Sequence, residues 1–133
     1  LRRRPLLQGD FDQAVELLTC DGQACSRDTF EQRVREITAD HLHHVVVVEF
    51  LPTAQLCAAG TMLIEQKFIH ACGCVGHVED LAVDASVDCP GLDGQLLWYL
   101  ISLATEHGCY KALVDCSEAR VPFYEQCGFE CRG

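Results

Sequence analysis

The run from Val75 to Asp84 carries two adjacent carboxylates inside a strand-forming stretch, and this stretch leads into a glycine-containing turn and a helix. Successive side chains of a strand point to opposite faces, so we expect Glu79 and Asp80 to face opposite sides of a sheet. An ionised carboxylate inside a sheet is costly unless a partner compensates it. The run therefore predicts a strand at 75–83, a functional site at its end and a helix at about 92–107.

The rest of the hydrophobic pattern predicts an α/β fold with a mixed central sheet and helices on both faces. Four consecutive valines indicate a buried strand at 45–50, and Ser26 is a good N-cap for a helix at 27–37. The parallel part of the sheet should join 75–83 to 111–115. The other predicted elements are strands at 1–7, 55–65 and 112–115, helices at 11–18 (with Asp10 as N-cap) and 118–126 (with Ser117 as cap), and a strand that begins at Phe129.

Length and charge restrict the kind of protein further. A chain of 133 residues predicts a single domain that spans residues 1–133. The net charge of −10 argues against nucleic acid as a partner, because neutralising phosphates needs a basic surface. No apolar run reaches the length of a membrane span, so we expect none.

Ten cysteines are many for such a chain, and three explanations apply. A disulfide framework is typical of short secreted proteins, whereas this chain has the pattern of a good apolar core. Zinc is weakly supported, since no Cys-x-x-Cys pair is present. The composition favours the third explanation, free thiols that pack as small hydrophobic side chains in a reducing cytosol.

Three places carry side chains suited to chemistry, and each also has a plain structural explanation. The turn from Asp88 to Gly94 precedes a helix N-terminus and could bind an anion, or it could be an ordinary turn with Asp93 as helix cap. Asp115 and Tyr124 could share a cleft at the strand ends and act as base and acid, or they could be a cap and a core residue. Cations and aromatic residues near the other strand ends could bind a phosphate or lie on a solvated surface: Lys67, His70, Tyr110 and Lys111.

Several segments together resemble the GNAT superfamily of acetyltransferases, and closely its glucosamine-6-phosphate N-acetyltransferases. The motif Phe-Tyr-x-x-x-Gly-Phe at 123–129 is typical of the superfamily. Glu-x-Lys-Phe-Ile-His at 65–70 and Gly-Cys-Tyr-Lys at 108–111 are typical of the narrower group. The similarity spans nearly the whole chain. It implies the GNAT fold and the transfer of acetyl from acetyl-CoA to the amine of glucosamine 6-phosphate, for UDP-N-acetylglucosamine synthesis, without a metal.

The resemblance also implies roles for residues. Asp115 and Glu79 would serve the amine, and Tyr124 would stabilise the leaving thiolate. The implied substrate-binding residues are Thr19, Lys67, Phe68, Ile69, His70, Glu79, Asp80, Tyr110 and Lys111. The implied cofactor-binding residues are Leu81, Ala82, Val83, Cys89, Pro90, Gly91, Leu92, Asp93, Gly94 and Arg120. A cytoplasmic homodimer is the implied assembly.

The chain departs from the resemblance in three ways. The pyrophosphate loop, Asp88 to Asp93, keeps one of the three marker residues, and Arg120 replaces an asparagine. The closing C-terminal strand, which the family exchanges between subunits, is not found in the 133 residues. Two alternatives therefore stay open: an acetyltransferase for another amine, such as a polyamine or a peptide, and a non-catalytic relative that binds CoA.

Overall fold

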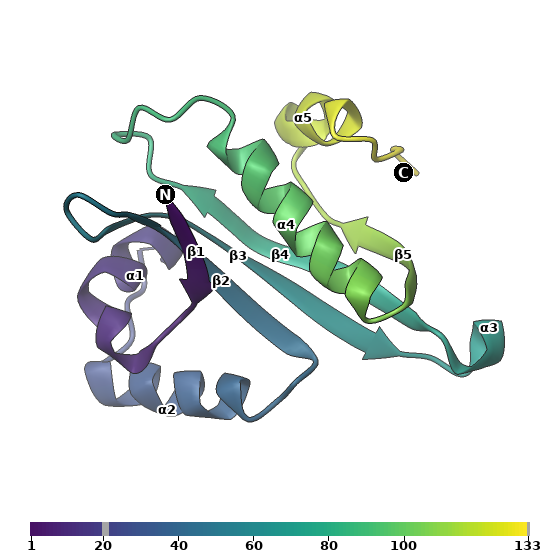
Figure 1. Ribbon diagram of the computed structural model, residues 1–133, viewed down its shortest axis with the longest axis horizontal. Helices are drawn as coiled ribbons and strands as arrows, with labels where there is room; N and C mark the ends of the chain where they lie inside the picture. The colour runs from purple at the N-terminus through teal and green to yellow at the C-terminus, as the bar shows by residue number, and fades with distance from the viewer. Residues whose placement is uncertain (20–21, 133) are drawn as a thin grey trace.

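The computed structural model describes residues 1–19 and 22–132, which build a five-stranded sheet with helices on both faces (Figure 1). The strands lie in chain order, β1-β2-β3-β4-β5. The first four are antiparallel to their neighbours, and β5 is parallel to β4, as the sequence predicts. Their bounds are β1 Arg2–Pro5, β2 His43–Phe50, β3 Gln55–Gln66, β4 Cys74–Val83 and β5 Cys109–Val114.

Successive side chains along the strands pack alternately into two separate apolar layers, one on each face of the sheet. Val46 and Val48 of β2 pack on the side of α4 (Leu92–Glu106), whereas Val47 packs with the residues of α1 (Phe11–Leu18) and α2 (Arg27–Thr38). This is the period-two alternation of a strand that is buried on both faces. Figure 1 shows α1 and α2 together along the β1–β2 side of the sheet and α4 running across β3, β4 and β5. No helix in the described part of the chain is long and apolar enough to cross a membrane.

A buried ion-pair network fixes the β1 edge of the sheet. The Arg4 guanidinium donates to both carboxylate oxygens of Asp10 at 2.8 Å and to Glu49 of β2 at 3.0 Å. Asp10 stands directly before α1, as predicted. Its carboxylate does not cap that helix, because it binds Arg4 and the Leu7 N–H instead. The short 3₁₀ segment that it closes, η1 (Gln8–Asp10), connects β1 to α1.

A β-bulge in β4 accommodates the carboxylate pair. Ala59 of β3 pairs with Ala82 and Thr61 pairs with Glu79, so the single residue Gly60 lies opposite two residues of β4. Asp80 takes a positive φ of 52° within this bulge. Glu79 and Asp80 are both exposed, and the strict alternation expected for them does not hold there.

The C-terminal segment differs from its prediction in two respects. The expected helix at 118–126 is a 3₁₀ turn, η2 (Glu118–Arg120), followed by α5 (Val121–Gln126). Pro122 lacks the N–H that would bond to the carbonyl of Glu118 in a continuous α-helix, and Ser117 makes no side-chain cap bond. The strand expected from Phe129 is also wrong, because residues 129–132 form no strand. The N–H of Phe129 is used instead at the end of α5, where it donates to the carbonyl of Tyr124 at 3.0 Å.

Candidate active site

The strands β4 and β5 part at the end where the sequence places its carboxylates. Val78 and Val114 are their last paired residues, and β4 continues from Glu79 to Val83 without β5 beside it (Figure 1). Glu79 and Asp115 are the next residues after that last pair, so the structure brings both to the point of separation. Both side chains are exposed. Two predicted carboxylates from distant parts of the chain therefore lie on neighbouring strands at the same end of the sheet.

The parting of the strands also leaves backbone donors without a neighbouring strand. The N–H of Asp84 donates to the carbonyl of Cys57 in β3 at 2.8 Å. Successive N–H groups of a strand alternate in direction, so those of Val83 and Leu81 point away from β3, toward the side that β5 has left. Preorganised N–H groups of this kind can stabilise a developing oxyanion.

The turn before α4 lies next to this opening. Gly91 is the N-cap residue of α4 and has a φ of 79°, a conformation that side chains with a Cβ rarely adopt. One of the two explanations for this turn made Asp93 the helix cap. The structure shows instead that Asp93 is the second residue of α4. Its Oδ1 accepts the N–H of Gly94 at 2.8 Å, and its Oδ2 lies 3.5 Å from an Arg120 nitrogen. The sequence gives no signal for this pair, since its members are separated along the chain and only folding brings η2 to α4.

Tyr124 is held in place by the end of α5. Gly128 donates to the carbonyl of Glu125 and Phe129 donates to that of Tyr124, both at 3.0 Å, with Gly128 at a φ of 97°. These bonds make a Schellman motif, in which the residue after the glycine packs on the helix. The rings of Tyr124 and Phe129 accordingly meet edge to face at 5.7 Å. The Phe-Tyr-x-x-x-Gly-Phe motif thus has a structural reason, which is to fix the tyrosine.

The electrostatic surroundings keep Tyr124 protonated. Its side chain is 8 % exposed, and this burial raises the pKa of the phenol above its ordinary value of 10. The guanidinium of Arg120 works in the opposite direction, because it lies 6.0 Å from the Tyr124 ring centroid and 4.2 Å from that of Phe123. A neutral phenol next to the opening between the strands can act as an acid.

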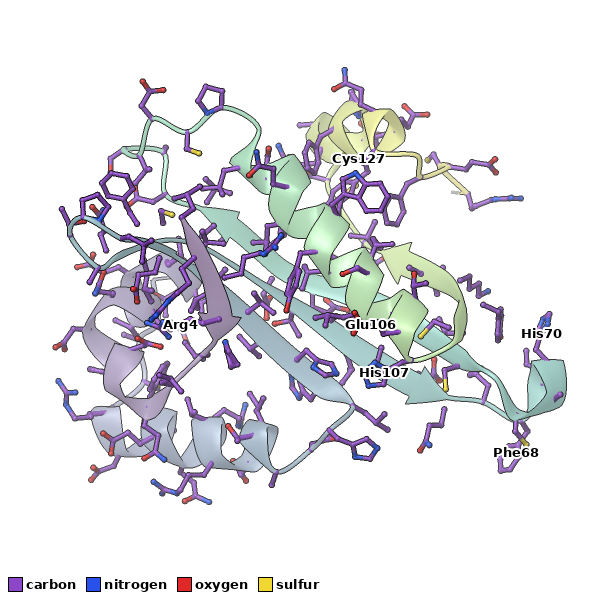
Figure 2. The ribbon with its side chains drawn as sticks, in the orientation of Figure 1. Arg4, Phe68, His70, Glu106, His107 and Cys127 are labelled. Carbon is purple, nitrogen blue, oxygen red and sulfur yellow. The ribbon has the colours of Figure 1, made fainter. Side chains whose placement is uncertain are left out.

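The predicted phosphate-binding residues lie at the other end of the sheet. Figure 2 shows Phe68 and His70 at the tip of the connection between β3 and β4, far from the start of α4. The His70 ring stacks on Tyr110 at 4.0 Å. The short element α3 (Ile69–Cys72) has left-handed rather than helical backbone angles at His70 and Ala71, and Phe68 is 93 % exposed. Lys67 is half-buried and pairs with Glu65 at 3.4 Å.

The structure therefore separates the predicted site residues into two groups. Lys111 lies in β5 and Asp115 directly follows that strand. The four residue-to-residue steps from Lys111 to Asp115 span roughly 13 Å at about 3.3 Å each. Thr19, at the C-terminal end of α1, donates its hydroxyl hydrogen to the carbonyl of Val15. Cys20 and Asp21, which follow it, lie outside the described residues.

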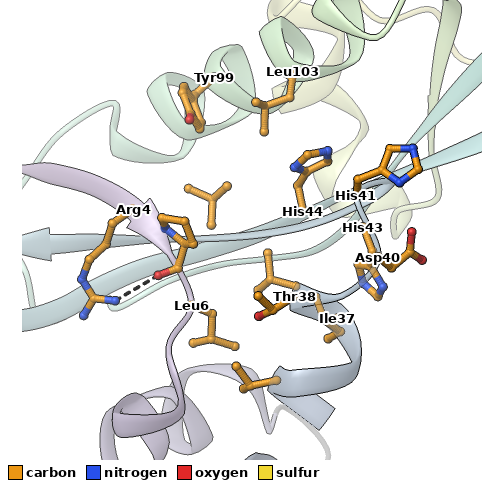
Figure 3. Close-up of a pocket in the computed structure, with 14 residues that line it drawn as sticks. Arg4, Leu6, Ile37, Thr38, Asp40, His41, His43, His44, Tyr99 and Leu103 are labelled. Atoms are coloured by element: carbon orange, nitrogen blue, oxygen red, sulfur yellow. Dashed lines mark hydrogen bonds between the residues drawn. The ribbon is translucent and has the colours of Figure 1, made fainter.

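Sequence reasoning also missed a cavity of ≈ 270 Å³ between α2, α4 and the β2 edge (Figure 3). Three histidines line it: His41, His43 and His44. Within residues 1–19 and 22–132, no group of three or more His, Cys, Asp or Glu side chains is arranged to hold a metal ion. The nine described cysteines are free thiols.

Comparison with known proteins defines the class. The sequence model of the acetyltransferase (GNAT) family matches residues 11–129. The crystal structure of glucosamine-6-phosphate N-acetyltransferase from Arabidopsis thaliana superimposes with a TM-score of 0.91 at 31 % identity, over 99 % of this chain and 92 % of that one. The chain belongs to the acetyltransferase (GNAT) family and has its fold.

Within the family, the chain is similar to the glucosamine 6-phosphate N-acetyltransferases. It is 42 % identical to glucosamine 6-phosphate N-acetyltransferase 1 of Oryza sativa subsp. japonica over 107 residues, which are 78 % of this chain. It spans 64 % of the length of that relative. The protein of the same name from Dictyostelium discoideum is 32 % identical over 133 residues, with 98 % of this chain and 85 % of the relative covered.

Proposed function

We propose that this chain transfers the acetyl group of acetyl-CoA to the amine of glucosamine 6-phosphate. The product, N-acetylglucosamine 6-phosphate, would supply UDP-N-acetylglucosamine synthesis. The observation that carries the proposal is the parting of β4 and β5, where Glu79 and Asp115 follow the last paired residues and the N–H groups of Leu81 and Val83 point away from β3. Residues 1–133 act as one acetyltransferase domain in this proposal.

The reaction needs a neutral amine, a polarised thioester and a protonated leaving group. Asp115 and Glu79 orient the amine and receive its proton, directly or through water. The backbone N–H groups of Leu81 and Val83, with Ala82 between them, bind the thioester oxygen, and one such donor contributes about 3 to 4 kcal/mol to the transition state. The amine nitrogen attacks the carbonyl carbon, the C–S bond breaks, and Tyr124 gives its proton to the CoA sulfur.

The phosphates of CoA would bind at the start of α4. This region combines the backbone N–H groups of the first turn of α4, the positive end of the helix dipole and the guanidinium of Arg120. The residues assigned to this region of the cofactor site are Cys89, Pro90, Gly91, Leu92, Asp93, Gly94 and Arg120.

The sugar phosphate would bind to the second group of residues, contributed by another subunit. Asp80 and Thr19 are assigned to the sugar in the same proposal. One hexose phosphate is shorter than the roughly 13 Å from Lys111 to Asp115 at about 3.3 Å per residue. A homodimer solves this problem if the Lys67–His70 turn and Tyr110–Lys111 of one subunit face the opening of the other. Exposed Leu63 and Leu113, at 37 % and 44 %, lie on the sheet surface that such contact would cover.

The cellular location in this proposal is the cytoplasm. Acetyl-CoA-dependent sugar activation and free thiols both suit a reducing compartment. Among the described cysteines, Cys25, Cys72, Cys116, Cys127 and Cys131 are exposed as well as free.

The test is CoA thiol release from acetyl-CoA with the full-length protein, measured with and without glucosamine 6-phosphate. We expect release that depends on the sugar phosphate and saturates with it. Glucosamine, a polyamine and a peptide N-terminus are the comparison acceptors. Faster turnover with an amine that lacks phosphate would reject the acceptor, and no release with any amine would reject the enzyme.

A further inference from the structure

One side chain occupies the place where an anionic ligand would bind. Asp93 accepts the Gly94 N–H with one carboxylate oxygen at 2.8 Å and lies 3.5 Å from Arg120 with the other. A backbone N–H at the start of a helix and a guanidinium are the two kinds of donor that a phosphate group binds best. The carboxylate thus contacts the donors in the way that a phosphate oxygen would.

The rest of the structure keeps these donors together. Arg120 stacks on Phe123 with its guanidinium carbon 4.2 Å from the ring centroid, which holds the charge near the start of α4. A negative side chain in the first turn also stabilises its own helix through the macrodipole. The Asp93 contacts therefore stabilise the protein when no ligand is bound.

Asp93 and Arg120 are both accessible to a ligand that could replace the contact between them. The side chain of Asp93 is 34 % exposed and that of Arg120 is 47 % exposed, so solvent and ligands reach the pair. Ion pairs with this exposure contribute little to stability, typically about 0 to 1 kcal/mol. A diphosphate with more charge can displace such a carboxylate.

We propose that Asp93 is an internal competitor of the cofactor, whose carboxylate holds the Gly94 N–H and Arg120 until a CoA phosphate replaces it. The inference rests on the proposed use of acetyl-CoA. In the free protein the carboxylate occupies the phosphate position. In the complex Arg120 and the amide bind phosphate, and Asp93 turns to solvent. Asp93 and Arg120 together set the cofactor affinity of this chain.

The experiment is calorimetric titration with CoA and, separately, with pantetheine, which has no phosphates. Asp93→Asn keeps the size of the side chain and removes its charge, so we expect CoA to bind about threefold or more tightly, with pantetheine unchanged. The gain should shrink in high salt, because salt screens the repulsion between exposed charges. Asp88→Asn, the same change in the same turn, is the matched control and should alter CoA affinity by less than about half of that factor.

A double-mutant cycle tests whether Arg120 is the shared donor. Arg120→Gln should weaken CoA binding, and should weaken it more in the Asp93→Asn background, where no carboxylate engages the guanidinium. Unchanged or weaker CoA binding by Asp93→Asn, or an equal gain with pantetheine, would overturn the inference. Binding is measured without an acceptor, so a failure to acetylate glucosamine 6-phosphate would reject the proposed reaction and leave this inference standing.

Discussion

Tyr124 shows how the backbone at a helix end fixes the position of a single side chain. Burial raises the pKa of the phenol above 10 and has a larger effect than the guanidinium of Arg120, which lowers that pKa, so the proton stays in place. A raised pKa favours the neutral form, so the group remains an acid through the whole neutral range and loses its proton only in strong alkali. The position is supplied by the helix end that Gly128 makes possible.

Tyr124→Phe removes the acid and keeps the aromatic packing against Phe129. We expect the turnover number to fall by about 10²-fold or more, while the affinity for CoA stays close to that of the unchanged protein. Because the pKa of the phenol lies above 10, the group stays mostly protonated up to pH 9, and the ratio of the two rates should be nearly constant from pH 6.5 to 9. Steady-state kinetics across this range is the measurement. A variant that keeps its full turnover number would show that the leaving sulfur takes its proton from elsewhere.

The bulge between β3 and β4 links packing to the site, because it depends on Gly60. A Cβ at this position would lie 2.8 Å from Leu100 and 3.1 Å from Leu81, and Leu100 is completely buried. Gly60→Ala should lower the free energy of unfolding by about 1 to 3 kcal/mol through overpacking. It should also weaken CoA binding, since Leu81 carries one of the free N–H groups. Urea unfolding and calorimetry measure the two effects.

Gly9→Ala is the control for that change. A Cβ on Gly9 meets no atom within 4 Å, so its stability should stay within about 0.5 kcal/mol of the starting protein. If Gly60→Ala were equally harmless, the bulge would not depend on the glycine.

Helices and strands that depend on short-range sequence patterns can be predicted from the sequence. Features that depend on how two elements pack or pair cannot. The four valines of β2, Ser26 before α2 and the run into α4 act over a few residues, and the structure confirms these elements. The β4 bulge depends on the register with β3, which the local pattern of β4 does not contain. Gly128 is a sequence signal for the end of α5. The prediction of a strand from Phe129 is wrong because the residue after a C-terminal glycine belongs to the helix cap.

The candidate site follows the same division. Glu79 and Asp115 follow the last paired residues of β4 and β5, because parallel strands place their carboxyl ends at the same edge of the sheet. The position of Lys67 and His70 relative to the opening between β4 and β5 depends on how the whole chain folds and assembles. Figure 2 shows His70 at the far end of the sheet, which is why the proposed function assigns these residues to a second subunit.

Strand β2 and helix α4 are joined by a pair of histidines, of which His44 should make stability depend on pH. His44 of β2 and His107 at the end of α4 meet edge to face at 4.9 Å, and His107 Nδ1 lies 2.9 Å from the carbonyl of Leu103 (Figure 3 shows His44 below α4). His44 Nε2 is buried with no hydrogen-bond partner among the described residues. Burial, and then the nearby His107, lower the pKa of His44 below 6.5; His43 adds to this, whereas Asp40 and the His41 backbone oppose it.

The sign of the effect follows from the lowered pKa. Below pH 6.5 His44 binds a proton in the unfolded chain but stays neutral in the folded protein. The free energy of unfolding is therefore greatest above pH 6.5 and falls as the pH drops toward the lowered pKa of the folded His44. His44→Phe keeps an aromatic ring against His107 and should flatten this fall. His41→Gln, an exposed change on the same segment, should keep it. Urea unfolding at pH 7.5, 6.5 and 5.5 compares them, and equal slopes in all three proteins would show that the unpartnered nitrogen does not control acid stability.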